Sequence, residues 1–338
     1  MRILYVRNLN QVASIEGDEL ARRGNSVRVY EPNLAGKDAS LPIKLVMMPG
    51  RVLSLRDIVG DINQNCFDIV HIHWASYGIL GLLSKIPFIV ECHGSDVRYH
   101  LKQPLYRSIL TSIFRKAAAV LCITPDLLPI VQSIRPDAFF LPGPVDTARF
   151  SPLEDHETDA ARPWTILLCM RLDPIKGPEI ATQGIAQFVQ RHPDVRVQLL
   201  DWGLWKEKYK RDYGDRFEFI PRVPPDKVQH LIWSADVIVG QCNLGILSFC
   251  ELQAMSCAKP VVCSFSYEEA YSTPPPVCQA TTSGDIDAHL ENLFQHSDVG
   301  ATLGRKAREW VIKNHDSRSL SKRLETLYQS IVEVPVGL

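Results

Sequence analysis

Arg171 and Lys176 are the two residues whose positions most directly suggest chemistry. They lie in the segment RLDPIKGP, residues 171–178, which follows an apolar run at 164–170 that is typical of a strand. Pro178 then starts a helix that is expected to run to about Arg191. The junction between a strand's carboxyl end and a helix's amino end favours anions. Two fixed cations there predict a site that binds a diphosphate and balances its charge when it departs as a leaving group. The alternative is that Arg171 and Lys176 are only surface charges.

A second loop of the same kind lies within residues 235–264. This segment is expected to begin as a buried strand at 237–239, turn through a polar, glycine-bearing stretch at 240–245, continue as a short helix and end in a strand at 260–263. Backbone N–H groups in the first turn of such a helix have no partner within the helix, so they attract phosphate. The candidate residues for this contact are Gly245, Ile246, Leu247 and Ser248.

Two polar side chains of that short helix have different predicted roles. Ser248 and Glu251 fit the S-x-x-E capping box, in which both side chains satisfy backbone N–H groups at a helix start. Gln253 lies about 200° around the helix from Glu251, so the two residues face different ways. The amide of Gln253 can hydrogen-bond a ribose hydroxyl, without the charge assistance that a carboxylate would give.

His93 is the candidate for contact with a reacting group in the first half of the chain. It follows an apolar strand at 87–92 directly, so it is expected at the carboxyl edge of a parallel sheet, where site residues concentrate. Asp96 can orient the imidazole ring or cap the next helix. His71 and His73 lie within their own strand and are interpreted as core or supporting residues.

The elements that position these residues form two alternating series of strands and helices. Strand and helix patterns that alternate in this way predict doubly wound parallel sheets. The first series contains strands at 2–6, 27–30, 68–73, 87–92, 119–124 and 139–141, with helices at 9–23 and 103–117. The second contains strands at 164–170, 195–200, 217–220, 237–239 and 260–263, helices at 178–191 and 225–234, and a final amphipathic helix at 316–331.

Length and composition support a soluble α/β protein with two domains. A chain of 338 residues is long for one core, and 46% hydrophobic with 22% charged residues is ordinary for a globular protein. The net charge of −1 argues against a nucleic-acid partner. Three prolines at 142–152 and an acidic stretch at 154–161 predict the linker. No phosphate-binding loop, zinc-protease or serine-hydrolase motif occurs.

Cysteine usage and hydropathy predict a cytoplasmic protein. Most of the nine cysteines lie in apolar runs and form no C-x-x-C pair, which favours thiols in a reducing compartment and argues against a structural zinc site. Met1 leads straight into a strand, and no apolar run reaches the roughly 18 residues of a membrane span. The basic amphipathic helix at 103–117 leaves two interpretations open: weak peripheral membrane contact, or a solvated flank.

Several of these segments resemble motifs of the family 4 retaining glycosyltransferases, which have the GT-B fold. Residues 254–262, AMSCAKPVV, are similar to the family's EAMA-x-G-x-PVV signature, and residues 171–177 to its R-x-x-x-x-KG segment. Residues 93–96 are similar to its HGSD turn, and residues 142–152 to the P-x-GVD-x-x-x-F-x-P link between its domains. The resemblance covers nearly the whole chain.

The resemblance implies a fold of two doubly wound Rossmann-like domains that face each other across a cleft. Residues 1–152 would form the acceptor side and residues 153–315 the nucleotide-sugar side, while residues 316–338 would cross back onto the first domain. It also implies transfer with retention of anomeric configuration, with a nucleotide sugar as co-substrate and no obligatory metal or other cofactor. A UDP-sugar is favoured because UDP is the frequent donor in the family.

The resemblance assigns roles to individual residues. His93 would contact the transferred sugar, with Asp96 beside it in the same turn. Arg171 and Lys176 would bind the leaving diphosphate. Gly203 would lie in the turn under the nucleotide and Val223 in the turn that meets the base through backbone atoms, with the donor contacts of Gly245, Ile246, Leu247, Ser248 and Gln253 as described above.

Some positions depart from the family pattern and keep two alternatives open. The two glutamates that flank the family signature correspond to Gly245 and Gln253, the Gly-Gly loop after the first strand is replaced by residues 7–10, and Pro144 replaces a linker glycine. The alternatives are a non-catalytic sugar-nucleotide-binding or partner subunit of the same fold, and a nucleotide-sugar epimerase. The acceptor, whether sugar, lipid-linked or small molecule, and the oligomeric state carry no sequence motif.

Overall fold

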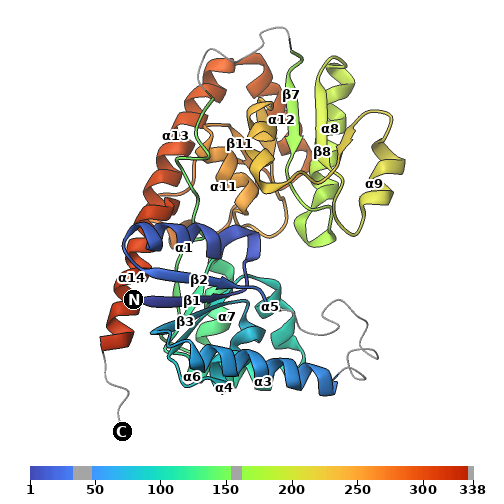
Figure 1. Cartoon of the computed structure of the whole chain (residues 1–338). Helices are drawn as coiled ribbons and strands as arrows, with labels where there is room; N and C mark the ends of the chain where they lie inside the picture. The colour runs from blue at the N-terminus through green and yellow to red at the C-terminus, as the bar shows by residue number, and fades with distance from the viewer. Residues whose placement is uncertain (33–47, 154–161, 334–338) are drawn as a thin grey trace. The chain divides into compact units, whose positions relative to one another are not determined.

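The computed structural model describes residues 1–32, 48–153 and 162–333, and the chain divides into two compact units (Figure 1). Unit 1 comprises Met1–Pro144 together with Ser317–Leu338, and unit 2 comprises Val145–Asp316. The chain therefore leaves unit 1 once and returns to it with its last helix. The stretch 154–161, predicted as a linker, lies outside the described residues.

Unit 1 is built on a six-stranded sheet of order β2-β1-β3-β4-β5-β6, in which every pairing is parallel. Its strands are β1 (Arg2–Val6), β2 (Ser26–Tyr30), β3 (Ile69–His73), β4 (Phe88–Cys92), β5 (Ala119–Cys122) and β6 (Phe139–Phe140). Its α-helices are α1 (Val12–Arg22), α3 (Met48–Gln64), α4 (Ile79–Leu83), α5 (Ser95–Arg98), α6 (Pro104–Lys116), α7 (Leu128–Gln132) and α14 (Ser317–Glu333).

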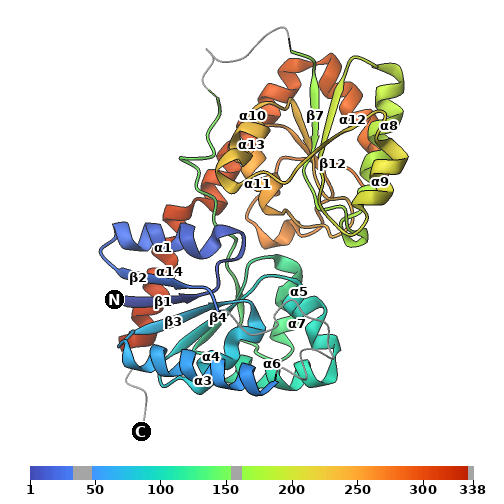
Figure 2. The same ribbon diagram turned by 45° about the vertical axis from the view of Figure 1, so that its right-hand side comes forward.

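Successive residues of these strands face opposite layers, because side chains alternate along a strand. Ile3 and Tyr5 of β1 face α1 and α14, which contributes Leu320, Leu324 and Tyr328 to that layer. Leu4 and Val6 face the other side, where α3, α4 and α6 pack. The two layers can be followed in Figures 1 and 2. Helix α14 thus completes one of the two cores of unit 1.

Unit 2 contains a second parallel six-stranded sheet, of order β12-β11-β10-β7-β8-β9. Its strands are β7 (Thr165–Leu168), β8 (Arg196–Leu200), β9 (Glu218–Ile220), β10 (Val237–Val239), β11 (Val261–Cys263) and β12 (Cys278–Gln279). Its α-helices are α8 (Pro178–Arg191), α9 (Lys206–Tyr213), α10 (Val228–Trp233), α11 (Phe249–Ser256), α12 (Ser283–Gln295) and α13 (Ser297–His315). Helices α8 and α12 pack on one face and α10, α11 and α13 on the other.

These sheets confirm the predicted fold class of two Rossmann-like parallel sheets covered by helices. Two long helices, α3 and α13, were not predicted, and the helix expected at 225–234 begins as the 3-10 turn Pro225–Lys227 before α10. In α13 the buried positions include Gly300 and Gly304, and a Cβ atom on Gly304 would lie 1.9 Å from the carbonyl oxygen of Ala258. Glycines of low helix propensity weaken a helical pattern even where close packing requires them.

One disulfide corrects the expectation that the cysteines are thiols. Cys169 and Cys250 are bonded, with their Cα atoms 6.0 Å apart and the two residues 81 positions apart along the chain. Cys169 directly follows β7 and Cys250 lies in the first turn of α11, so the fold brings together two residues that no local spacing pairs. The other seven cysteines are free.

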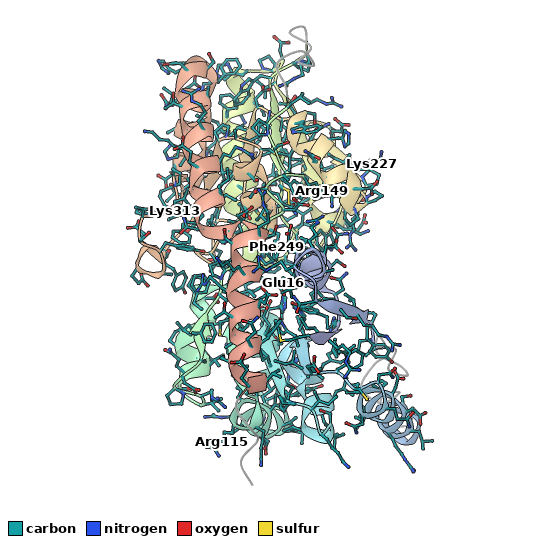
Figure 3. The ribbon with its side chains drawn as sticks, turned by 60° about the vertical axis from the view of Figure 1, so that its left-hand side comes forward. Glu16, Arg115, Arg149, Lys227, Phe249 and Lys313 are labelled. Atoms are coloured by element: carbon teal, nitrogen blue, oxygen red, sulfur yellow. A yellow bond between two sulfur atoms is a disulfide. The ribbon has the colours of Figure 1, made fainter. Side chains whose placement is uncertain are left out.

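Helix α6 is amphipathic as expected. It buries Leu110, Ile113 and Phe114, while Arg115 and Lys116 are exposed at its end (Figure 3). Within the described residues, no helix combines the length and the apolar character that crossing a membrane requires.

Candidate active site

The loops that carry the predicted anion-binding residues leave unit 2 from neighbouring strands. In the sheet order, β7 lies next to β10, and the connections run outward from this point in opposite directions. Ligands of open α/β sheets bind where the strand order reverses in this way. Residues 169–177 follow β7 and residues 240–248 follow β10, so both loops lie at this switch point.

The backbones of the two loops are in direct contact. The N–H of Cys242 donates to the carbonyl oxygen of Lys176 at 2.9 Å. Gly177 has φ +70°, and a Cβ atom there would lie 3.1 Å from the Cβ atom of Asn243. Only glycine adopts this conformation at little cost, so the sequence Lys176-Gly177 allows the second loop to approach. The structure therefore brings the predicted cation loop against the loop that leads to α11.

The cation loop is braced by Asp173. This buried carboxylate pairs with the guanidinium group of Arg171 and accepts the backbone N–H of Leu204 at 2.7 Å. The Arg171 side chain is held by Asp173 but remains 42% exposed, so solvent can reach it. Lys176 is half-buried and ends the 3-10 turn Pro174–Lys176 just before α8.

Gln241 organises the second loop. The residue is fully buried, and its amide nitrogen donates to the carbonyl oxygens of Ile246 and Ser264. Its amide oxygen accepts the backbone N–H of Leu244 at 2.7 Å and that of Asn243 at 3.2 Å. One side chain thus fixes both ends of the turn. Sequence reasoning missed Gln241, although a glutamine directly after a buried strand and a glycine was the available signal.

Glu251 supports the same loop from α11. It forms the predicted capping box with Ser248, and its carboxylate accepts the backbone N–H of Ser248 at 2.9 Å. Its other oxygen accepts the N–H of Gln241 at 2.8 Å. The structural interpretation of Glu251 is confirmed. Helix α11 starts at Phe249, which Figure 3 labels.

The remaining candidates of this loop differ in accessibility. Ile246 and Leu247 are buried, whereas Ser248 and Gln253 are half-buried. Gly245 has φ +66° and its carbonyl oxygen accepts the N–H of Ser266 at 2.9 Å. A Cβ atom at Gly245 would lie 2.7 Å from the Ser266 hydroxyl oxygen, so the glycine is required by packing.

Gly203 lies against the cation loop. Its φ is +124°, and a Cβ atom there would be 2.5 Å from the backbone nitrogen of Leu172. The N–H of Leu172 donates to the carbonyl oxygen of Trp202 at 2.8 Å. Trp202 is partly exposed, and the guanidinium carbon of Arg222 lies 4.9 Å from its ring centroid. Val223 follows Arg222 in the coil after β9. The turn that contains Gly203 and the turn that contains Val223 therefore meet at the contact between Trp202 and Arg222.

In unit 1, Asp96 shapes the turn that carries His93. Its buried carboxylate accepts the backbone N–H groups of Gly94 at 2.7 Å, Ala75 at 2.8 Å and His93 at 3.2 Å. Of the two roles predicted for Asp96, the structure has the carboxylate on backbone amides at the start of α5. The imidazole ring of His93 is held by other residues: its Nε2 atom is hydrogen-bonded to Nδ1 of His73 at 2.9 Å and lies 3.2 Å from Glu91.

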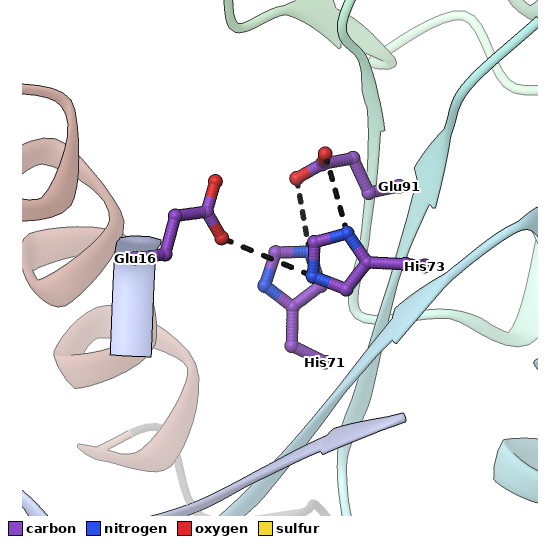
Figure 4. Close-up of side chains that lie close together, drawn as sticks. All are labelled: Glu16, His71, His73 and Glu91. Atoms are coloured by element: carbon purple, nitrogen blue, oxygen red, sulfur yellow. Dashed lines mark ion pairs between the residues drawn. The ribbon is translucent and has the colours of Figure 1, made fainter. Parts of the chain in front are cut away.

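His93 belongs to a buried cluster of ionisable side chains that sequence reasoning did not assemble. Glu16, His71, His73 and Glu91 are each at most 1% exposed and lie together between the sheet and α1 (Figure 4). Burial lowers the pKa of His73 to about 4. Burial and the neighbouring Glu91 raise the pKa of Glu16 well above its usual value.

The pKa of Glu91 is shifted in the opposite direction from that of Glu16. Burial by itself would raise the pKa of its carboxyl group, but the contacts with His73, His71 and His93 outweigh that effect and hold the pKa well below its usual value. The carboxylate therefore remains ionised in the core. The signal available in the sequence was the His-x-His spacing in β3 followed by Glu-x-His at the end of β4, since both patterns place their members on one face of a sheet.

The loop after β1, where the resembling family carries two glycines, adopts backbone conformations that favour glycine. Arg7, Asn10 and Gln11 have φ values of 73°, 48° and 64°. The guanidinium carbon of Arg7 lies 4.9 Å from the ring centroid of Trp74. Three residues other than glycine thus have positive φ in this loop, and the Arg7 guanidinium group stacks on an aromatic ring.

The whole fold matches solved glycosyltransferase structures. Sucrose-phosphate synthase from Thermosynechococcus elongatus aligns with a TM-score of 0.76 and 14% identity over 99% of this chain and 100% of that one. HepE from Anabaena, solved in complex with UDP-glucose, aligns with a TM-score of 0.74 and 13% identity over 98% of this chain and 100% of the other. At these identities the similarity shows the fold, which is GT-B.

Sequence comparison matches part of the chain to a glycosyltransferase family model and finds distant glycosyltransferase relatives. Residues 11–136 match the glycosyl transferase 4-like domain. A D-inositol 3-phosphate glycosyltransferase from Pseudarthrobacter chlorophenolicus is 21% identical over 99% of this chain and 91% of that protein. One from Acidothermus cellulolyticus is 28% identical over 41% of this chain and 33% of its own length. The chain thus has the GT-B fold, and its residues 11–136 match a family 4-like glycosyltransferase domain.

Proposed function

We propose that the protein transfers a sugar from a UDP-sugar to a hydroxyl group of an acceptor, with retention of the anomeric configuration. The observation that carries this proposal is the contact between the two switch-point loops of unit 2, where the N–H of Cys242 donates to the carbonyl oxygen of Lys176. The contact joins the loop that bears two cations to the loop that leads into α11. HepE, of the same fold, binds UDP and UDP-glucose.

In this proposal the diphosphate of the donor lies at the joined loops. Arg171 and Lys176 neutralise its oxygens, and their charges stabilise the additional negative charge that develops as the glycosidic bond breaks. Backbone N–H groups of residues 245–248 add donors at the start of α11. Gly203 lets the neighbouring turn approach without a side chain.

The remaining candidates recognise the rest of the donor. The amide of Gln253 bonds the ribose, Trp202 stacks on the base, and Val223 contacts the base through backbone atoms. His93 contacts the transferred sugar, since its Nε2 atom is already occupied and Nδ1 has no hydrogen-bond partner among the described residues. Asp96 acts as a positioning residue, because its carboxylate holds the turn that carries His93.

The chemistry needs no metal in this proposal. The two cations of unit 2 take the part that a divalent ion takes in other nucleotide-sugar sites, and the leaving phosphate oxygen accepts the proton of the acceptor hydroxyl. The acceptors to be tested should include inositol phosphates, because the relatives named above act on D-inositol 3-phosphate.

The test is donor turnover in the wild type and in Arg171→Ala and Lys176→Ala. Each variant is expected to lose about 100-fold or more in kcat/KM, equivalent to about 3 kcal/mol of transition-state stabilisation. Arg305→Ala and Lys306→Ala, at exposed positions of α13, are the matched controls and should keep wild-type rates.

The outcomes separate the proposed function from its alternatives. UDP-sugar is incubated with the acceptor panel, and the products are analysed by proton NMR for the anomeric configuration. Transfer with an α-linked product from an α-donor supports the proposal. Binding without any turnover identifies a sugar-nucleotide-binding subunit, an epimerised donor identifies an epimerase, and wild-type rates in both alanine variants refute the phosphate contacts.

A further inference from the structure

A buried group of four side chains in unit 1 has the composition and spacing of a metal site. One ligand atom from each of Glu16, His71, His73 and Glu91 lies within 4.8 Å of the others. Glu16 comes from α1, the histidines from β3 and Glu91 from β4, as Figure 4 shows. The group is independent of the diphosphate contacts proposed for unit 2.

Each of the four side chains has at least one buried ligand atom without a hydrogen-bond partner. The Nε2 atoms of His71 and His73, Oε2 of Glu16 and both carboxylate oxygens of Glu91 are buried, and none has a hydrogen-bond partner. A buried polar atom without a partner destabilises a core, because it has lost its hydrogen bonds to water. Four residues that each bring an unpaired ligand atom within 4.8 Å of the others call for a ligand that satisfies all four.

The partners of the other ring nitrogens leave each Nε2 atom available. Nδ1 of His71 is hydrogen-bonded to the hydroxyl group of Tyr328 at 2.6 Å, and Tyr328 is bonded in turn to the hydroxyl group of Tyr5 at 2.9 Å. Nδ1 of His73 is hydrogen-bonded to Nε2 of His93 at 2.9 Å. Histidines that bind metals characteristically have the second nitrogen held in this way, which orients the ring.

The distances between the candidate ligand atoms fit four-coordinate geometry. Bonds of about 2.0 Å in a tetrahedral site separate neighbouring ligand atoms by about 3.3 Å. Nε2 of His71 lies 3.3 Å from Oε2 of Glu91, and Nε2 of His73 lies 3.9 Å from Oε2 of Glu16. Side-chain adjustments of roughly an ångström would bring all four atoms into such a shell.

Charge points to a divalent cation. Two carboxylates are buried here, and the ion pairs recorded for them in the described part of the chain are with histidine alone. A divalent ion would neutralise both carboxylates, whereas the two histidines can bind it in their neutral form. Imidazole nitrogens together with carboxylate oxygens suit first-row transition metals, and Zn²⁺ accepts both.

We propose that unit 1 holds a structural transition-metal ion of the Zn²⁺ type, bound by Glu16, His71, His73 and Glu91. The ion would tie α1 to the centre of the sheet. Its effect on His93 would be indirect, through the hydrogen bond between His73 and His93. The proposal departs from the sequence-based expectation of no metal site, which rested on the absence of cysteine motifs.

The test measures metal bound to the full-length protein. The chain is produced in medium supplemented with Zn²⁺, and separately with Co²⁺, so that the site fills during folding. After exhaustive dialysis, elemental analysis is expected to give about one ion per chain, and the Co²⁺ protein is expected to show the intense visible bands of a four-coordinate ion.

Matched variants assign the site. His73→Gln and Glu16→Gln remove one ligand each with little change of shape, and each should lower the bound metal at least tenfold. His296→Gln and Glu309→Gln, at exposed positions of unit 2, should leave it unchanged. Circular dichroism of every variant checks that it is folded.

A measurement on the wild type alone keeps the test decisive if the ligand variants fail to fold. Removing the ion with a chelator should lower the melting temperature by several degrees, and adding Zn²⁺ should restore it. The proposal is overturned if the wild type grown with either metal retains less than about a tenth of an equivalent. It is equally overturned if folded ligand variants bind as much metal as the controls, in which case the cluster is a histidine–carboxylate hydrogen-bond network.

Discussion

At the scale of single residues, two buried side chains decide the shape of the loop before α11. Gln241 bonds both ends of the turn, and Glu251 accepts backbone N–H groups from Gln241 and Ser248. The capping box was readable because Ser248 and Glu251 are three residues apart. The role of Gln241 could not be read from the sequence, because its partners Ile246 and Ser264 are brought together only once the next strand is in place.

We predict that Glu251→Gln both destabilises unit 2 and weakens the binding of the UDP-sugar. The amide keeps the shape of the side chain but turns one N–H₂ group toward a backbone N–H, so one buried donor loses its acceptor. The expected loss is about 1–3 kcal/mol of unfolding free energy, measured by urea denaturation. Glu309→Gln, exposed on α13, is the control. A loss below about 0.5 kcal/mol would contradict the assignment of Glu251 to the loop.

At the scale of elements, the predictable parts of the fold are those whose signals are local. Short stretches of sequence are enough to predict the apolar strands, helix α8 after Gly177-Pro178, and the loops after β7 and β10. The buried cluster of unit 1 does not. Its histidines lie two residues apart on β3, yet His71 bonds to Tyr328, 257 residues further along the chain, so only the packing of α14 completes it.

Gly203 tests how closely two loops of unit 2 must pack. In Gly203→Ala, the new Cβ atom would lie 2.5 Å from the backbone nitrogen of Leu172, and alanine disfavours the observed φ of +124°. The loop that carries Arg171 must then shift. We expect a lower unfolding free energy by about 1–3 kcal/mol and a raised KM for the donor.

The control for that prediction is Gly284→Ala in the first turn of α12. A Cβ atom at Gly284 would meet only the hydroxyl oxygen of Thr282, at 3.8 Å. Alanine is the better helix former, so stability should stay equal or rise slightly. If the two alanine variants behave alike in urea denaturation and donor kinetics, the contact between Gly203 and Leu172 has no role in holding the cation loop.

At the scale of the whole molecule, the two units depend differently on the chain's continuity. Unit 2 is one continuous segment, Val145–Asp316, and contains both of its hydrophobic cores. Unit 1 is assembled from Met1–Pro144 and the segment that starts at Ser317. Leu320, Leu324 and Tyr328 of α14 are at most 3% exposed in the core that also contains Tyr5 and Ile69. Without α14, the part of that sheet face that α1 does not cover would be open to water.

We therefore predict that residues 145–316 fold alone, whereas residues 1–144 do not. Burial of Leu320, Leu324 and Tyr328 contributes about 1.5–3 kcal/mol per side chain, and three such losses approach the whole stability of a typical domain. Circular dichroism and urea denaturation of the two fragments test this directly. Adding a peptide of residues 317–333 should restore cooperative unfolding to residues 1–144, and the same peptide with Leu320, Leu324 and Tyr328 replaced by serine should not. A cooperative transition in residues 1–144 alone would mean that α1 and the sheet form a sufficient core without the returning helix.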